Sequence, residues 1–190
     1  MSGSNVQLDS GEFAQRVVLY QAPGADGATN DPVGAGSPLP TTGGGGKSAS
    51  ATFTPAAASH VAGDCNGAAA EFAFGAPSAC VFMITDADLY IPDGTAAATA
   101  WRLHLYNVTP PSALADDTAW DVPSGDRTAY LGYIDLGTAI DLGTTQGIQN
   151  AGVNRSVKLS GTSVFGYLVN LTTLTPAAVA HSVRLRGTPL

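Results

Sequence analysis

The hydrophobic positions of this chain repeat mostly every second residue, which is the period of a strand with one buried face. Trp101, Leu103 and Leu105 alternate with more polar neighbours, and the same alternation returns at Val183 and Leu185. Residues 164–169 carry apolar side chains on both faces, which predicts a central strand. Further strands are expected at residues 52–54, 70–74, 80–91, 130–135 and 156–159.

Clusters of turn-forming residues separate these apolar runs. They are Gly63-Asp64, Pro92-Asp93-Gly94, Pro123-Ser124-Gly125-Asp126 and Asn150-Ala151-Gly152. Short strands with turns at such intervals predict an all-β fold, with an antiparallel β-sandwich or jelly-roll-like body over residues 51–190. Helical periodicity is nearly absent. One short helix is expected at residues 111–117, which begin with proline, and another turn is expected after Pro123.

Residues 1–50 differ from the rest in composition. They contain ten of the 23 glycines, including the run 43–46, together with Pro38 and Pro40. Such a composition predicts an extended Gly/Pro-rich N-terminal arm. One segment of this arm has the β-branched and aromatic content of a strand. Its residues Arg16, Val17, Val18, Leu19 and Tyr20 are the expected partner-binding residues, and they would pair with the body or with a neighbouring subunit.

The charge content narrows the classes of function. The chain is 44% hydrophobic but only 12% charged, about half the usual share of ~25%. Its net charge is −7, and its eight Lys and Arg residues form no basic cluster, which argues against binding to nucleic acid. The N-terminal residues lack the pattern of a signal peptide, and no run approaches the ~20 apolar residues of a membrane span.

The motif that most resembles a catalytic one is the glycine run 43–46 followed by Lys47 and Ser48. A phosphate-binding loop needs glycine five positions before Gly46, but Thr41 stands there. A linker is therefore the favoured interpretation. The pattern Gly-x-Ser-x-Gly does not occur, and glutamate is present only at Glu12 and Glu71. We expect no enzymatic activity, and no catalytic, cofactor or metal site.

The histidines and cysteines also lack the spacing of a site. His60, His104 and His181 have no metal-ligand partner at short spacing. His104 is expected at the surface or at an interface. Cys65 and Cys80 are expected to be two small buried side chains, with a disulfide as the less favoured alternative.

One acidic cluster could in principle hold a structural cation. Asp86 and Asp88 share one face of a predicted strand, and Asp93 follows in the next turn. Because the spacing of a calcium loop is missing, solvated carboxylates are the favoured interpretation.

Residues 101–136 combine two strand motifs with a distinctive connection. The motifs are a strand Arg102-Leu103-His104-Leu105-Tyr106-Asn107, a connection rich in Pro, Ala and Asp, and a second strand Tyr130-Leu131-Gly132-Tyr133-Ile134-Asp135. In these features the chain resembles a family of tailed-phage structural proteins. Agreement at Phe53-Thr54-Pro55, at His60–Asp64 and in the C-terminal strands extends the resemblance over most of residues 52–190.

The resemblance implies a β-rich capsid decoration, or cement, protein that is often trimeric. It would bind the major capsid protein on the outer surface of the phage head after synthesis in the bacterial cytoplasm. The first alternative is a tail or baseplate structural protein of similar fold. The second is a carbohydrate-binding module, which would need Trp101, Trp120 or Tyr133 to line a groove. The strand pattern instead predicts that Trp101 faces the core.

Overall fold

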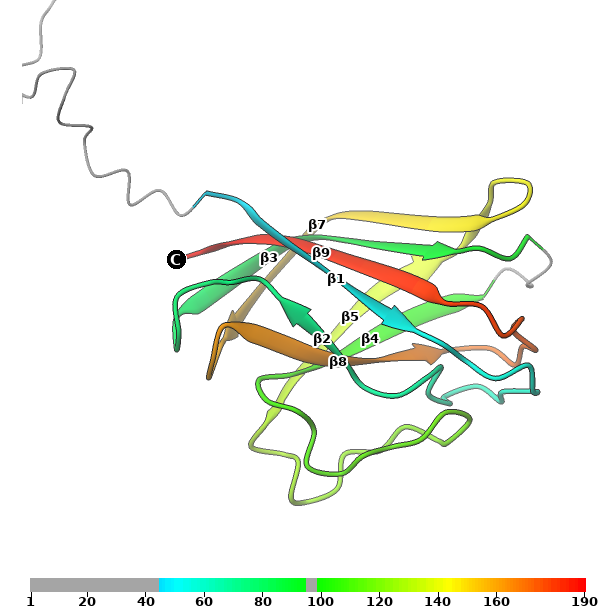
Figure 1. The fold of residues 1–190 in the computed structure, drawn as a ribbon, viewed down its shortest axis with the longest axis horizontal. Coiled ribbons are helices and arrows are strands. Elements are labelled where there is room, and N and C mark those ends of the chain that lie inside the picture. Colours follow the sequence, from blue (N-terminus) through cyan, green and yellow to red (C-terminus); the bar gives the residue numbers. More distant parts are fainter. Residues whose placement is uncertain (1–44, 95–98) are drawn as a thin grey trace, which may run out of the picture. The chain divides into compact units, whose positions relative to one another are not determined.

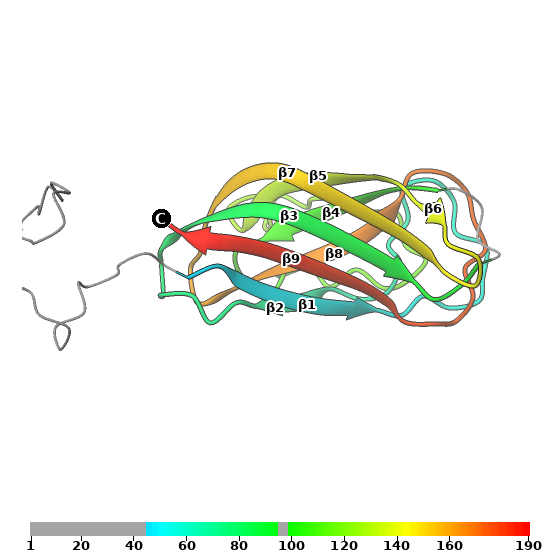
Figure 2. The ribbon, with the colours of Figure 1, turned by 90° about the horizontal axis from the view of Figure 1, so that it is seen from above.

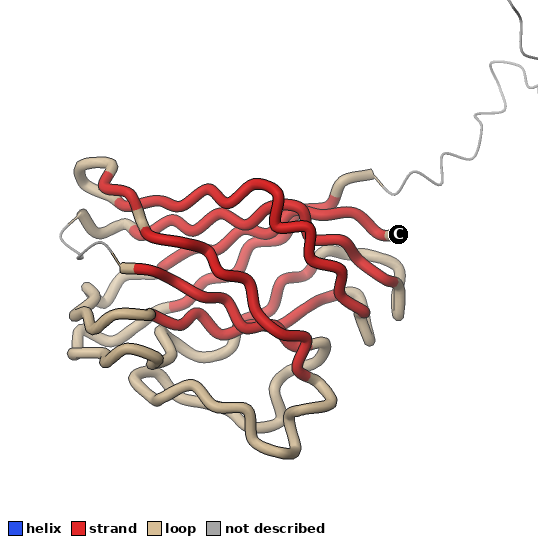
Figure 3. The backbone as a smooth tube through the Cα atoms, turned by 180° about the vertical axis from the view of Figure 1, so that it is seen from behind, coloured by secondary structure: helices blue, strands red, loops and turns tan. Residues whose placement is uncertain are grey.

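A computed structural model describes residues 45–94 and 99–190 of the chain. Every regular element in these residues is a β-strand, and no helix occurs among them (Figure 3). The strands form two antiparallel sheets that pack face to face (Figure 1). The prediction of an all-β antiparallel fold is therefore confirmed for this part of the chain.

The larger sheet has five strands in the order β1-β9-β3-β7-β6 (Figure 2). Their bounds are β1 Lys47–Phe53, β3 Val81–Ile91, β6 Ile140–Asp141, β7 Gln146–Lys158 and β9 His181–Pro189. β1 begins earlier than the strand expected at residues 52–54, so residues 47–50, which we assigned to the arm, are part of this sheet.

The smaller sheet has four strands in the order β2-β8-β4-β5. Their bounds are β2 Ala70–Ala73, β4 Ala100–Tyr106, β5 Tyr130–Thr138 and β8 Ser163–Asn170. β8 lies between β2 and β4. Seven of its eight residues are buried and the remaining one is half-buried, so both faces of the strand are covered. The prediction that residues 164–169 form a central strand is confirmed.

The turn predicted at residues 150–152 is wrong, because β7 runs through it. The register with β3 passes from Ile84↔Arg155 directly to Asp86↔Ala151, so β7 has extra residues opposite Thr85. Gly152 has a φ of 81° there, a backbone conformation that glycine adopts at low cost. The turn-like composition therefore marks a β-bulge, where the strand bends without ending.

The helix predicted at residues 111–117 is also wrong, because this segment is an irregular loop. Its backbone N–H groups bind distant partners instead of a helical turn: Ser112 donates to Asp126 and Leu114 to the hydroxyl of Tyr167. Asp117 has a φ of 58°, which is incompatible with a continuing right-handed helix. The turn expected after Pro123 is present, closed by the N–H of Asp126 on the carbonyl of Pro123.

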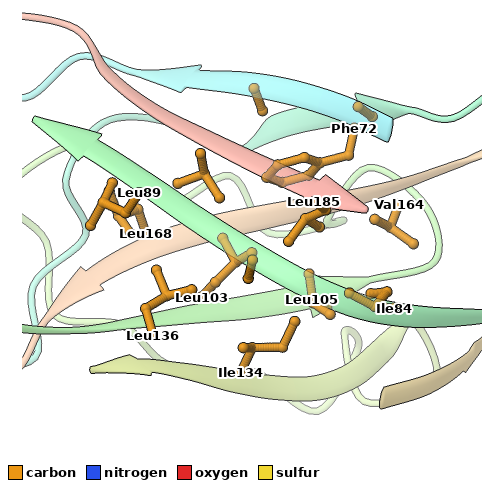
Figure 4. Close-up of a cluster of buried hydrophobic side chains, with 14 of the residues drawn as sticks. Phe72, Ile84, Leu89, Leu103, Leu105, Ile134, Leu136, Val164, Leu168 and Leu185 are labelled. Carbon is orange, nitrogen blue, oxygen red and sulfur yellow. The ribbon is translucent and has the colours of Figure 1, made fainter. Parts of the chain in front are cut away.

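The core lies between the sheets, where the inward side chains of both layers meet (Figure 4). Leu103, Leu105 and Leu168 of the smaller sheet pack in one cluster with Ile84, Leu89 and Leu185 of the larger one. Trp101 is 1% exposed, which confirms its predicted orientation toward the core. Burial of each such side chain contributes about 1.5–3 kcal/mol to the stability of the folded state. Because these side chains occupy every second position of their strands, alternation along the sequence decides which face of each strand is turned to the core.

Candidate functional site

The two sheets have outer faces of different character. No described segment crosses the outer face of the five-stranded sheet (Figure 2). Its β1 positions are small and polar, with Ser48, Ser50 and Thr52 all exposed. Small uncharged side chains at these three positions leave the β1 part of this face open, and another protein can pack on such a surface.

Two arginines and one carboxylate dominate the middle of this face. Arg184 donates to Asp88 Oδ2 at 2.6 Å, and Arg186 reaches the same oxygen at 2.9 Å. The pairing follows from the register, because Asp88 and Asp86 lie opposite Arg184 and Arg186 on the neighbouring strand. Asp86 and Asp88 do share one face, as the sequence predicts, but Asp88 binds two arginines there.

An apolar corner adjoins this charged group. It consists of Tyr90, Ile140 and Leu142, which are 49%, 67% and 62% exposed. Cross-strand pairing places Tyr90 and Ile140 on either side of Gly147. A Cβ added to Gly147 would lie 3.0 Å from Leu142 Cδ1, so Leu142 lies over this glycine. Three large apolar side chains thus gather at one end of the sheet, as in the apolar centre of a protein–protein interface.

The outer face of the four-stranded sheet is covered by the chain itself. Residues 107–129, which connect β4 to β5 and which we name the cover loop, fold back over it. Its ends meet where the N–H of Asn107 donates to Ala129 O at 2.9 Å. Farther along, the backbone N–H of Trp120 donates to Gly63 O, and the backbone N–H of Cys65 donates to Thr118 O, each at 2.9 Å. Long connections without regular structure are uncommon in compact domains and are often functional.

The cover loop encloses a second, smaller core. Cys65, Tyr106, Ala129, Tyr167 and Val169 are buried in it, and Leu114 and Trp120 pack against them. The hydroxyl of Tyr167 accepts a hydrogen bond from the N–H of Leu114 at 2.9 Å and donates to Ser112 O at 3.2 Å. The aromatic side chains of this outer sheet face therefore bind the loop through polar groups as well as by packing.

One attachment of the loop is a carboxylate with three donors. Asp116 accepts from the N–H of Ala56 at 2.7 Å, from the N–H of Gly67 at 2.6 Å and from His60 Nε2 at 3.1 Å. Gly67 has a φ of 86°, and a Cβ there would lie 2.8 Å from the backbone N of Thr54, so only glycine fits.

The pKa values of Asp116 and His60 are shifted in opposite directions by this attachment. Burial by itself raises the pKa of Asp116, but the hydrogen bonds from Ala56, Gly67 and His60 outweigh it and lower that pKa. Burial by itself lowers the pKa of His60, but its bonds to Asp116 and Ala58 and the charge of Asp117 raise it above 6.5. Both shifts favour the ion pair.

Both ring nitrogens of His60 face acceptors, because Nδ1 lies 3.1 Å from Ala58 O and Nε2 lies 3.1 Å from Asp116 Oδ1. Only the doubly protonated ring can donate to both. The side chain is also 0% exposed. A His–Asp pair resembles part of a catalytic triad, but this ring has no free nitrogen to accept a proton from a substrate.

The second attachment is a stack of aromatic rings. The His104 and Trp120 rings are stacked with centroids 3.4 Å apart, and His104 Nδ1 lies 3.0 Å from the hydroxyl of Tyr130. His104 is 2% exposed, so the predicted surface position is wrong. Strand alternation correctly places His104 on the outer face, but the cover loop buries that face.

His104 is held neutral by this environment. Burial, aided by the positive charge of Arg102, lowers the pKa of His104 to about 3. Such a shift corresponds to about 5 kcal/mol against protonation. The attraction of a cation to the face of Trp120 is worth about 0.5–2 kcal/mol, so it does not reverse the shift.

The third histidine lies in the main core. His181 is 1% exposed and meets the ring of Trp101 edge-on, with centroids 5.5 Å apart. Within the described residues neither ring nitrogen has a hydrogen-bond partner. Burial and the neighbouring charge of His60 lower its pKa to about 4, so His181 is neutral near neutral pH. The spacing of the histidines in the sequence gave no sign of their different environments.

The predicted partner-binding segment lies outside the described residues, so its role stays a prediction. It consists of Arg16, Val17, Val18, Leu19 and Tyr20.

The two cysteines are free thiols, with Cys65 buried and Cys80 half-buried. Burial raises the pKa of Cys65 to about 12, so its thiol stays protonated. Lys47 and Ser48, at the end of the glycine run, belong to β1.

Tyr133 is 44% exposed, but the guanidinium of Arg102 lies 4.1 Å from its ring centroid. One face of this ring is therefore occupied, and Trp120 is stacked on His104, which leaves fewer open aromatic faces for a sugar ring.

In the part of the chain that the structure describes, no group of three or more His, Cys, Asp or Glu side chains is arranged to hold a metal ion. Among the same residues there is also no helix that is long and apolar enough to cross a membrane. Comparisons of the chain with protein-family models, with curated proteins and with solved structures found no match.

Proposed function

We propose that this chain is a capsid decoration protein of a tailed phage, which binds the major capsid protein on the outer surface of the head and stabilises the shell. The proposal rests on the resemblance of residues 101–136 to phage structural proteins and on the fold of the body. The observation that supports it best is the bare outer face of the five-stranded sheet with its apolar corner.

The finer fold that we propose is a jelly roll. A jelly roll forms when a long antiparallel hairpin of eight strands folds over on itself, so that first pairs with last and each following strand pairs inward. With β6 set aside as a short edge piece, the pairs β1–β9, β2–β8, β3–β7 and β4–β5 follow this rule. Viral capsid proteins use this fold, although lectins and cupins do as well, so the fold alone does not assign the function.

We assign the contact with the shell to the bare face for two reasons. The opposite face buries His104, Tyr106 and Tyr167 under the cover loop. Among the described aromatic side chains of its strands β4 and β5 it leaves only Tyr133 open, with Arg102 over one face of that ring. The bare face instead combines Tyr90, Ile140 and Leu142 with the Asp88–Arg184–Arg186 group. Apolar side chains beside paired charges fit a partner surface that is itself largely uncharged, since an unpaired charge is costly to bury.

The N-terminal arm has a separate role in this proposal. Its segment Arg16–Tyr20 would add a strand to a neighbouring copy or to a capsid subunit, and trimerisation would multiply weak contacts with the lattice. A protein without residues 1–46 should bind shells more weakly or fail to trimerise. Unchanged shell affinity and oligomeric state would contradict this role.

Binding to shells that lack the protein tests the assigned surface. The variant Ile140→Asp places a charge in the apolar corner, and a buried unpaired charge of this kind should weaken shell binding by at least about tenfold. The matched control is Val61→Asp. Val61 is similarly exposed, at 57%, but it lies beside Gly63, which binds the cover loop, and therefore away from the proposed contact surface. Equal shell affinities for both variants would contradict the assignment.

The tail or baseplate alternative is separated by location. Mass spectrometry of separated heads and tails should find the chain in heads. Its presence only in tails would overturn the proposed role as a capsid decoration protein.

A further inference from the structure

We infer that the cover loop is a pH-gated cover, held closed by two histidines that require opposite protonation states. His60 must carry a second proton to hold Asp116, and His104 must stay neutral to lie beneath Trp120. The loop is then most firmly closed in a window of pH near neutrality. It opens on either side of that window. This inference goes beyond the proposed function and does not depend on it.

The alkaline limit comes from His60. Its two acceptors, Ala58 O and Asp116 Oδ1, are both satisfied only by the imidazolium. Loss of the second proton leaves one acceptor without its donor and removes the positive charge beside Asp116. The groups facing His60 are Asp116 and Asp117 of the cover loop and His181 of β9, so two carboxylates and one neutral ring surround it.

The acid limit comes from His104, which the loop closes over. The ionisable groups around it come from three strands: Arg102 from β4, then Tyr130, Tyr133 and Asp135 from β5. On β8, Tyr167 is its cross-strand partner. Asp135 favours a proton on His104, but it already accepts from Arg102 at 2.7 Å, and burial beneath Trp120 has the larger effect. A proton is therefore accepted once the loop moves away and water reaches the ring.

The signs of the two effects are opposite. His60 has a pKa raised by closure, so its contribution is fully present below pH 6.5 and is lost as pH rises through the raised value. His104 has a pKa lowered by closure, so its contribution is fully present above pH 6.5 and is lost as pH falls toward about 3. Asp116, whose own pKa is lowered from 3.8, adds a further loss only as the pH falls below that ordinary value.

Opening would expose a defined surface. Beneath the loop lie the buried side chains of Tyr106, Tyr167 and Val169 on the outer face of the four-stranded sheet. The main core is on the other side of that sheet and keeps its own side chains covered. Opening therefore converts a polar loop surface into an aromatic one without unfolding the sandwich.

Amide hydrogen exchange from pH 4.5 to 8.5, corrected for intrinsic rates, measures the opening directly. The reporters are the amides of Cys65, Leu114 and Trp120, which are bonded to Thr118, Tyr167 and Gly63 across the boundary between loop and body. We expect their protection to be greatest near pH 6.5 and to fall by about 50-fold at pH 4.5, with a second fall at alkaline pH. The amide of Leu89, in the centre of the main sheet, should keep a higher protection throughout.

Two variants separate the two limits. His104→Phe should keep the stack with Trp120 and abolish the acid fall, while His60→Gln should abolish the alkaline fall. If His104→Phe does not fold, acrylamide quenching of the wild-type protein replaces it, because Trp101 is 1% exposed and only Trp120 can become accessible on loop opening. Protection that is independent of pH, an acid fall that persists in His104→Phe, or a Leu89 amide that exchanges as fast as the loop amides would each overturn the inference.

Discussion

The outer faces of the two sheets show what a covering segment does to the same kind of strand. Both faces carry aromatic side chains at alternating positions, such as Tyr90 on β3 and His104 on β4. On the five-stranded sheet Tyr90 stays 49% exposed, whereas on the four-stranded sheet the cover loop reduces the exposure of His104 to 2%. The covered face is a second core with shifted pKa values, and the bare face is the candidate surface for a partner.

The comparison is tested most strongly by acid, since only buried histidines resist protonation. His104 and His181 have folded pKa values of about 3 and about 4, against 6.5 when unfolded. Their contribution to stability is present above pH 6.5 and is lost as pH falls. For these two rings together we expect the free energy of unfolding to decrease by about 4 kcal/mol between pH 7 and pH 5, and the raised pKa of His60 offsets part of that decrease. Urea unfolding at both values measures it.

The variant His181→Leu serves as the control for this loss. It removes the ring that lies in the main core, which accounts for about 2 kcal/mol of the loss, so the acid loss that remains belongs to His104 on the covered face. A stability that is equal at pH 7 and pH 5 in the wild-type protein would show that the two rings are not held neutral.

The next largest effect is expected at Asp116, which attaches the cover loop to the body. Asp116→Asn replaces a carboxylate that accepts three hydrogen bonds and leaves the His60 imidazolium without its counter-charge. We expect a loss of about 3 kcal/mol in the free energy of unfolding, because breaking a buried ion pair is costly. Urea unfolding should show less than about 0.5 kcal/mol for the control Asp117→Asn, whose side chain is exposed. Equal losses for the two variants would contradict the anchor.

A smaller effect is expected at the ring stack. Trp120→Ala removes a half-buried ring that is stacked on His104 and lies 5.6 Å from the ring of Tyr130. Lost burial and ring contacts should destabilise the protein by about 2 kcal/mol. The pH titration of His104, followed by NMR, should also move toward the ordinary value. A His104 that still fails to titrate above pH 4.5 would mean that the loop does not bury it.

The smallest effect belongs to the bare face. Asp88→Asn breaks two ion pairs whose arginine side chains are 48% and 41% exposed. Water screens such pairs, so we expect a loss of at most about 1 kcal/mol that disappears at high salt. Thermal unfolding at low and high salt measures it. A loss as large as that of Asp116→Asn would remove the distinction between the two faces.

The sequence predicts the strands well where alternation is strong. The strand positions around Trp101, Leu103 and Val183 follow from a period of two, because burial of one face requires it. The β-bulge at Gly152 was mistaken for a turn, since both use the same residue types. Residues 111–117 were mistaken for a helix because an initial proline is compatible with one, while the partners of their N–H groups lie far away in sequence.

The candidate sites were less predictable than the strands. His60 and Asp116 are separated by 56 positions, and no local pattern brings them together. The apolar corner depends on Gly147, which lets Leu142 lie over the sheet, and this contact has no periodic signal. A residue's outward position on a strand can be predicted, but whether a loop covers it depends on tertiary contacts.

Electron microscopy of decorated shells tests the central claim most directly. The account predicts that the outer face of the five-stranded sheet, with Tyr90 and Ile140, lies against the capsid lattice and that the cover loop faces solvent. Density that places the cover loop against the lattice, with Tyr90 and Ile140 in solvent, would contradict it.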